Sequence, residues 1–262
     1  MTRSALFFFA VLAYGHDLYL MPSQFRLAPE QPLVLAAHVG DSFPASEGPI
    51  DPRRIVDAKV WTEGAPVENF RIIGRATWGT ATIATPGSHV LGIGSTPKFL
   101  ELEPAKFEAY LKEEGLDSIV AWRAANREAA KPGREIYSKY AKTLVTAQTP
   151  NDGYQLKAGY PIEIVLEADP TRMKPGDLLP IQVLWKGQPA AGLQVEVATA
   201  AKASKAGRTD GEGRLRVKLD QAGKYRLHTV AMERHANPAE ADWRSVWASF
   251  TFELTAAMVS AK

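Results

Sequence analysis

The chain has 262 residues, of which 45% are hydrophobic and 23% charged, so it can bury a sizeable core and is neither a disordered nor a fibrous sequence. Its 31 Lys and Arg residues against 29 Asp and Glu residues give no basic excess, and nucleic acid is not an expected partner. The sequence has no cysteine, which excludes disulfides, thiolate metal sites and iron–sulfur clusters, so any metal must be held by nitrogen and oxygen.

The beginning of the chain has the layout of a secretory signal peptide. Arg3 precedes an apolar run at 5–12, and small residues follow it, ending with Gly15. The run is too short to span a bilayer, and no later stretch is long enough either. The alternative is a buried first strand of a cytosolic domain. We expect residues 1–15 to be a signal peptide cut after Gly15, with a cut two residues earlier as second choice. The mature chain would begin at His16 and be periplasmic or secreted.

Short apolar segments follow over residues 16–102, separated by Pro and Gly, without helical segments between them. This spacing is typical of an antiparallel sandwich. We therefore predict an N-terminal β-sandwich region. Its expected strands include 32–40, 54–61, 67–73, 80–84 and 89–93.

A helical insert is predicted over residues 103–150, where the pattern changes. Pro104 suits a first helical position, and Gly115 suits a C-terminal stop. A second helix is expected to begin with Asp117. A third is expected over residues 134–145, because apolar side chains recur there every three or four residues. The stripe of this third helix consists of Ile136, Tyr137, Tyr140, Ala141 and Leu144.

Strand patterns return in residues 151–255, where apolar and polar residues alternate from Ile162 onward. The alternation indicates half-buried strands and a second antiparallel sandwich, immunoglobulin-like or transthyretin-like. Residues 256–262 form a small, polar tail that we expect to be frayed. The predicted fold class is mainly β, with two antiparallel β-sandwich regions and an α-helical insert.

Six segments spread over the expected mature chain together resemble one known family. They are HDLYLMP at 16–22, FLELEPAKFEAYLKEEGL at 99–116, REIYSKYAK at 134–142, VLWKGQPAAG at 183–192, TDGEG at 209–213 and DWRSVWASFTF at 242–252. That family is the exported domain-of-unknown-function group formerly described as a NikM-like periplasmic component of nickel or cobalt uptake. The resemblance implies an exported, all-β protein with a helical insert that handles a metal ion. It brings no established catalytic residues.

His16 is the sharpest candidate for chemistry. As a mature N-terminus it would offer both its α-amino group and its own imidazole Nδ1 to one metal, and a second histidine would complete a histidine brace. Nitrogen ligands of this kind suit copper(II) or nickel(II) and suit calcium or magnesium badly. The alternative is that His16 is a chance polar residue, with Asp17 or the neighbouring strand holding the N-terminus.

Four other histidines are candidate partner ligands. His38 is the first choice, because its expected strand is close in sequence to the N-terminal one. His228 is the second, and its side chain is expected to point away from the core. His89 at a strand start and His235 in a loop are weaker candidates, since turn polarity explains them. The predicted metal ligands are therefore His16, His38 and His228.

Sequence signatures of an enzyme are scarce. There is no complete glycine-rich phosphate loop and no nucleophile elbow, and Glu113 and Glu114 are expected on a solvated helix face. The leading prediction is a non-enzymatic exported binding protein for nickel, cobalt or copper, serving uptake with a membrane transporter or envelope protein as partner. One alternative is a non-catalytic cell-envelope interaction module that binds protein or carbohydrate. Another is a copper-dependent oxidase with an N-terminal histidine brace.

Overall fold

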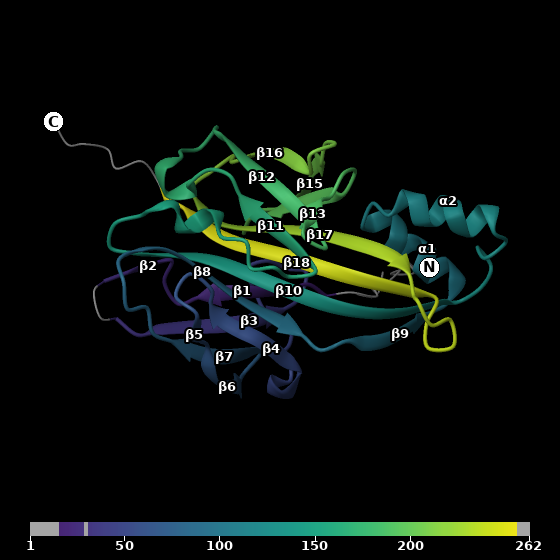
Figure 1. Cartoon of the computed structure of the whole chain (residues 1–262), viewed down its shortest axis with the longest axis horizontal. Helices are drawn as coiled ribbons and strands as arrows, with labels where there is room; N and C mark the ends of the chain where they lie inside the picture. The colour runs from purple at the N-terminus through teal and green to yellow at the C-terminus, as the bar shows by residue number, and fades with distance from the viewer. Residues whose placement is uncertain (1–15, 29–30, 256–262) are drawn as a thin grey trace, which may run out of the picture.

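A long central sheet organises the fold, with a smaller sheet on each of its faces (Figure 1). The computed structural model describes residues 16–28 and 31–255, so the predicted signal peptide and the tail at 256–262 lie outside the described residues. The prediction of a mainly β chain built from sandwiches is confirmed. The two sandwiches are joined, because each small sheet packs on a different part of the same central sheet.

The sheets are composed as follows. The first outer sheet has the order β1 (Leu18–Pro22), β3 (Leu33–Val39), β7 (Ala76–Ala81) and β6 (Glu68–Ile73). The central sheet has the order β15 (Ala203–Arg208), β14 (Gln194–Ala198), β17 (Gly223–Arg234), β18 (Trp243–Leu254), β10 (Gly133–Ala147), β8 (Gly87–Ser95), β4 (Ile55–Val60) and β5 (Ala65–Pro66), with β2 (Arg26–Leu27) and β9 (Lys98–Leu102) also paired to β10. The second outer sheet has β11 (Ile162–Leu166), β12 (Leu178–Trp185), β13 (Gln188–Pro189) and β16 (Arg214–Lys218).

Strand β10 belongs to both sandwiches. On one face Ala141 and Val145 pack in the core under the first outer sheet, and on the other face Leu144 packs in the core under the second. Successive side chains of a strand point to opposite faces, which lets a single strand serve two cores. β10 pairs with β18 in parallel, whereas the outer sheets and the other main pairs of the central sheet are antiparallel.

Two helices cover the face of β17 and β18 that the second outer sheet leaves open. They are α1 (Pro104–Glu113) and α2 (Asp117–Ala125), and both predicted helices are confirmed. Pro104 stands in the first turn of α1, and Gly115 follows its end with φ +69°, the left-handed conformation that glycine adopts at least cost. Phe107 and Leu111 are fully buried against β17 and β18. In the described ranges, no helix is long and apolar enough to cross a membrane.

The predicted third helix, over residues 134–145, is wrong, because this segment lies within strand β10. The insert at 103–150 is thus helical only in its first half. Both faces of β10 are covered, and a strand buried on both sides lacks the apolar-polar alternation that identifies a half-buried one. Its polar residues are buried too: Lys142 forms an ion pair with Glu163 at 2.7 Å, both side chains being 2% exposed. Because buried polar residues stand between them, the apolar residues of this segment recur every three or four positions by chance, as they would in a helix.

Candidate functional site

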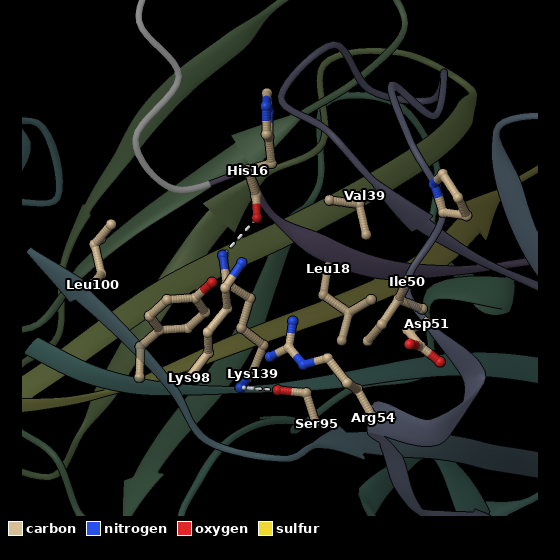
Figure 2. Close-up of a pocket in the computed structure, with 12 residues that line it drawn as sticks. His16, Leu18, Val39, Ile50, Asp51, Arg54, Ser95, Lys98, Leu100 and Lys139 are labelled. Carbon is tan, nitrogen blue, oxygen red and sulfur yellow. Dashed lines mark hydrogen bonds between the residues drawn. The ribbon is translucent and has the colours of Figure 1, made fainter.

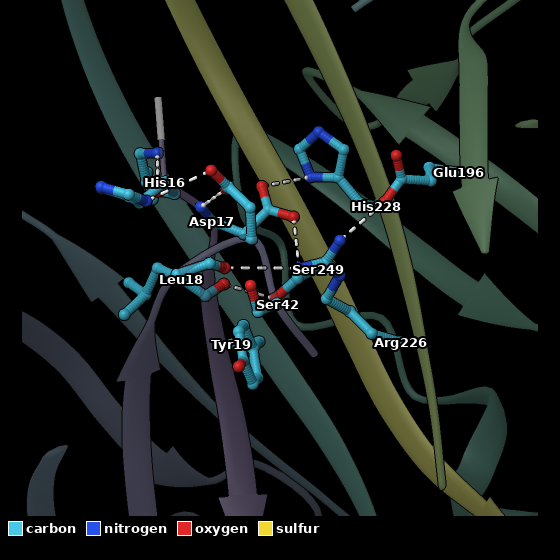
Figure 3. Close-up of polar contacts among 12 residues, drawn as sticks. His16, Asp17, Leu18, Tyr19, Ser42, Glu196, Arg226, His228 and Ser249 are labelled. Carbon is cyan, nitrogen blue, oxygen red and sulfur yellow. Dashed lines mark hydrogen bonds and ion pairs between the residues drawn. The ribbon is translucent and has the colours of Figure 1, made fainter. Parts of the chain in front are cut away.

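The segment His16–Asp17 lies directly before β1, close to Arg226 and His228 of β17 (Figure 3). His228 in turn contacts Glu114 at the end of α1. Three contacts to the backbone of His16–Asp17 hold this segment. The Lys139 ammonium donates to the carbonyl oxygen of His16, Asp17 N–H donates to Asp41 Oδ1 at 3.3 Å, and Gly40 N–H donates to the carbonyl of Asp17 at 3.0 Å. The N-terminal end of the described chain is therefore fixed to strand β10 and to the turn after β3.

Two carboxylates converge on the imidazole of His16. Its Nδ1 lies 3.2 Å from Asp41 Oδ2 and 3.3 Å from Glu47 Oε2. The three ligand atoms all lie within 4.8 Å of one another. The side chains of His16, Asp41 and Glu47 are 36%, 51% and 34% exposed, so the cluster is partly exposed, although the Nδ1 atom of His16 is itself buried.

Backbone amides orient both carboxylates. Asp41 Oδ1 accepts from the N–H of Asp17, and Glu47 Oε1 accepts from the N–H groups of Asp41 and Ser42 at 3.1 Å each. Each carboxylate therefore has one oxygen fixed by the backbone and turns its other oxygen toward His16. Burial opposes ionisation of Glu47, but the amides of Asp41 and Ser42 outweigh it and lower the pKa of this carboxyl, so it is charged near neutral pH.

One nitrogen and two oxygens at these separations fit a shared divalent transition-metal ion. Ligands at about 2.0–2.2 Å from one ion lie roughly 3.0–3.4 Å apart when they are neighbours in a tetrahedral or octahedral shell. The two nitrogen-to-oxygen separations at His16 fall in that range. The amide contacts are the outer-shell partners that orient metal-ligating carboxylates. The same arrangement also suits a protonated His16 in an ion pair, so protons and metal would compete for Nδ1.

His228 lies beside this cluster but is engaged by two other carboxylates. Its Nδ1 is 3.0 Å from Asp17 Oδ1, and its Nε2 is 2.9 Å from Glu114 Oε2. Burial alone would lower the pKa of His228, but the charges of Asp17 and Glu114 raise it to about 10. The ring is thus an imidazolium with both nitrogens donating, and it has no lone pair to offer a metal.

His228 lies on the face of β17 opposite Tyr225 and Leu227, as expected, but this face is covered and the side chain is buried. Its side chain is 7% exposed, because α1 covers this face of β17 and brings Glu114 over the ring. The prediction that Glu114 lies on a solvated helix face is also wrong, because its side chain is only 17% exposed and its carboxylate pairs with His228.

Arg226 completes the buried ion network around Asp17. Its Nη1 lies 2.8 Å from Asp17 Oδ2, and its Nη2 lies 2.6 Å from Glu196 Oε1. Burial raises the pKa of Asp17, but His228 and Arg226 more than reverse this and hold it well below its usual value. Asp17 is therefore a permanently charged anchor directly after His16.

The remaining histidines lie in other surroundings. His38 Nδ1 contacts the carbonyl oxygen of Pro44 at 3.1 Å, and its ring packs edge-on against Tyr19. Burial lowers the pKa of His38. His89 is buried between Thr62 and Thr85, and the ring of half-buried His235 contacts the carbonyl oxygen of Asn237. Among the described residues, the structure groups His16 with two carboxylates and with neither His38 nor His228.

Sequence reasoning identified His16 but missed Asp41 and Glu47. A signal for Asp41 exists: if β1 and β3 form an antiparallel pair, the residues just after β3 must return to the start of β1. The observed register, with Leu18 opposite Val39, does this. Glu47 reaches His16 only through the conformation of the loop after β3, and no sequence pattern around Glu47 predicts that conformation.

Comparison with known proteins gives one family and several solved structures of low similarity. No curated protein matches the chain. Three solved structures share low similarity: the Yersinia pseudotuberculosis adhesin InvE (12% identity, TM-score 0.25), the Escherichia coli adhesin FdeC (13%, 0.25) and the D00-D0 domain of intimin (11%, 0.22). The alignments cover 90%, 94% and 90% of this chain and 58%, 65% and 98% of those chains. The chain thus spans less than two thirds of the length of the InvE and FdeC chains.

The family comparison is broad, because one family model matches residues 13–233. The match includes His16, both carboxylates of the cluster, and the buried ion network. The chain belongs to the family described as a domain of unknown function, DUF4198.

Proposed function

We propose that this protein is an exported binding protein for a divalent transition-metal ion, and that His16, Asp41 and Glu47 hold the ion. The observation that carries the proposal is the convergence of Asp41 Oδ2 and Glu47 Oε2 on His16 Nδ1, with the second oxygen of each carboxylate fixed by backbone amides. Ligand atoms held in this way need little rearrangement to bind an ion.

Removal of a signal peptide after Gly15 would add a fourth ligand. The new α-amino group of His16 would chelate the ion together with Nδ1 of the same residue, giving two nitrogens and two oxygens. Such a set suits nickel(II), cobalt(II) or copper(II) better than calcium or magnesium. Export to the periplasm or beyond is part of this proposal, because the chelate requires the cut.

A binding role is favoured over a copper oxidase by the identity of the ligands. A histidine brace takes its third nitrogen from a second histidine, whereas the groups facing His16 are carboxylates. The partly exposed cluster also leaves room for a membrane or envelope partner to receive the ion, which accords with a role in uptake.

Titration calorimetry with NiCl₂ and CuCl₂ tests the proposal on five forms of the protein. The chain that begins at His16 should bind one equivalent, and a form with one extra residue before His16 should bind at least about tenfold more weakly, because its amine becomes a peptide nitrogen. The double variant Asp41→Asn/Glu47→Gln should show a similar or larger loss.

Glu68→Gln is the matched control, since Glu68 is an exposed carboxylate on the edge strand β6, and it should bind as the parent does. His38→Ala should also retain binding, because the ring of His38 contacts Pro44 and Tyr19. Equal affinity in the parent and in the double carboxylate variant would refute the proposed site.

A further inference from the structure

A cavity of about 510 Å³ begins at His16 and runs between the first outer sheet and the β9–β10 side of the central sheet (Figure 2). Cavities of about 300–1,000 Å³ are the usual size for small-molecule sites. Its lining comprises His16, Leu18, Val39, Pro49, Ile50, Asp51, Arg54, Ser95, Lys98, Leu100, Tyr137 and Lys139. His16 is thus common to this lining and to the proposed metal site, whereas the metal-site carboxylates Asp41 and Glu47 are outside the lining.

The charged groups of the cavity are mainly cationic. Arg54, Lys98 and Lys139 line it, against the single carboxylate of Asp51. That carboxylate is already engaged by the exposed side chain of Arg53, whose Nη2 lies 2.6 Å from Asp51 Oδ2. The excess of positive charge therefore favours an anion in the cavity.

Two of the cations are available to a ligand. Arg54 donates one N–H to the carbonyl of Thr96 at 3.1 Å and also hydrogen-bonds the hydroxyl of Tyr137, which still leaves donors among its five N–H groups for a ligand. Within the described residues, no carboxylate lies within ion-pair distance of Arg54 or of Lys98. Lys139 is different, because its ammonium donates to His16 and lies 3.8 Å from the centre of the Trp247 ring.

The remaining walls are apolar. Leu18, Val39 and Ile50 line the side formed by the first outer sheet and its loop, and Leu100 of β9 lies across the cavity from them. A free inorganic ion would leave these walls in contact with water. A ligand that has both a charged head and an apolar body would use the cations and the apolar walls together.

We propose that this cavity binds a small organic anion with a carboxylate or phosphate head and an apolar body. Arg54 holds the head through paired N–H donors, Lys98 adds a point charge, and the apolar walls bury the body. The side chains that hold the head and the body are not the proposed metal ligands, although His16 lines one end of the cavity, and binding needs no metal ion.

The test uses metal-free protein that begins at His16 and calorimetric titration with four probes. Hexanoate and hexyl phosphate carry a carboxylate and a phosphate head on the same six-carbon chain. Hexylammonium has the same chain with a positive head, and inorganic phosphate has the anionic head without the chain. We expect saturable binding of hexanoate or hexyl phosphate. We expect hexylammonium and inorganic phosphate to bind at least about tenfold more weakly than the better of these two.

Variants locate the binding. Arg54→Gln and Lys98→Gln should each weaken the better probe, Arg54→Gln by about tenfold or more. Arg71→Gln is the matched control, because Arg71 is an exposed arginine on the edge strand β6 and lies outside the cavity lining. It should bind like the parent, and thermal melting verifies that each variant is folded.

Three results would overturn the proposal: no saturable binding of either organic anion at millimolar concentration, equal binding of hexylammonium, or unchanged affinity in the Arg54→Gln/Lys98→Gln double variant. None of these results depends on metal binding, so the failure of one proposal is distinguishable from the failure of the other.

Discussion

Asp17 shows how strongly the state of one side chain depends on residues far away in the sequence. Its carboxylate is buried, yet it stays ionised because His228 and Arg226, more than 200 positions later, each donate to it. A buried charge with fully matched partners is costly to disturb, because removing one partner leaves the other uncompensated. The position of His16 next to this anchor is therefore well defined.

The pH dependence of stability should reveal the charge on His228. Its folded-state pKa is raised from 6.5 to about 10, so the folded protein holds this proton more tightly than the unfolded chain does. The stabilisation is complete below pH 6.5 and is lost as the pH rises toward 10. We expect His228→Gln to lower the free energy of unfolding by about 3–5 kcal/mol at pH 6 and by less near pH 10.

Urea unfolding at a series of pH values measures this difference. His235→Gln serves as the control, because His235 is a histidine in the loop between β17 and β18 that has no carboxylate partner among the described residues. A difference between parent and His228→Gln that stays constant across the range would contradict the assigned charge.

Glu135 should make the protein less stable as the pH rises, whereas a carboxyl whose pKa is lowered by folding makes it more stable. Glu135 is 1% exposed and accepts from the hydroxyls of Tyr110 and Ser245, yet burial raises its pKa from 4.5 to about 7. The folded state therefore binds its proton more tightly, and stability falls as the pH rises from 4.5 to 7. We expect Glu135→Gln to be more stable than the parent at pH 8, by up to about 3 kcal/mol, and similar at pH 4.

Chemical denaturation at the two pH values checks this expectation. The exposed Glu101 on the neighbouring strand β9 offers a matched control in Glu101→Gln, with little change at either pH. A Glu135→Gln variant that is destabilised equally at pH 4 and pH 8 would show that folding does not raise the pKa of this carboxyl.

The contact between α1 and the start of β10 positions the helices on the central sheet. Gly133, the first residue of β10, lies directly under the ring of Phe107, where an added Cβ would overlap that ring. Its φ is not in the left-handed region, so the requirement for glycine here is steric. Since α1 also carries Glu114 onto His228, this packing contributes to the surroundings of the candidate site.

Gly133→Ala should therefore destabilise the protein by about 1–3 kcal/mol through overpacking. Thermal unfolding measures the change. Gly211→Ala is the control, because an added Cβ at Gly211 meets nothing within 4 Å, and its effect should stay within about 0.5 kcal/mol. Equal stabilities for the two variants would mean that Phe107 moves aside without cost.

Local patterns predicted those elements whose apolar residues keep the period of a helix or a strand. Pro104, Gly115 and the apolar stripe of α1 predicted the first helix, and the alternation of apolar with polar residues predicted strands β3 and β18, although β18 is buried on both faces. Strand β10 was missed because its apolar and polar residues do not alternate. At the candidate site, His16 was identifiable from its place after the expected signal peptide, whereas Asp41 and Glu47 reach it only through the pairing of β1 with β3 and the turn beyond.

The shared central sheet makes the two sandwiches one folding unit. The parallel pairing of β10 with β18 extends from Glu135 opposite Trp243 to Thr143 opposite Thr251. It joins the strands that carry the first core to those that carry the second. Separating the two halves would expose both edges of this pair and part of each core to water.

We therefore expect a single cooperative unfolding transition for residues 16–255. Differential scanning calorimetry should give a calorimetric enthalpy equal to the van 't Hoff enthalpy. Fragments cut near residue 150 should not fold separately, because each would lose one strand of the central pair. Two resolved transitions, or a folded fragment, would contradict the shared-core architecture.

The metal site is the central claim, and its position in the molecule can be observed directly. Crystals of the chain that begins at His16, soaked with nickel(II), would give an anomalous difference map at the nickel edge. The account predicts one strong peak about 2.0–2.2 Å from His16 Nδ1 and from one oxygen of each of Asp41 and Glu47. A nickel peak bound by His38 or His228, with none at His16, would contradict it.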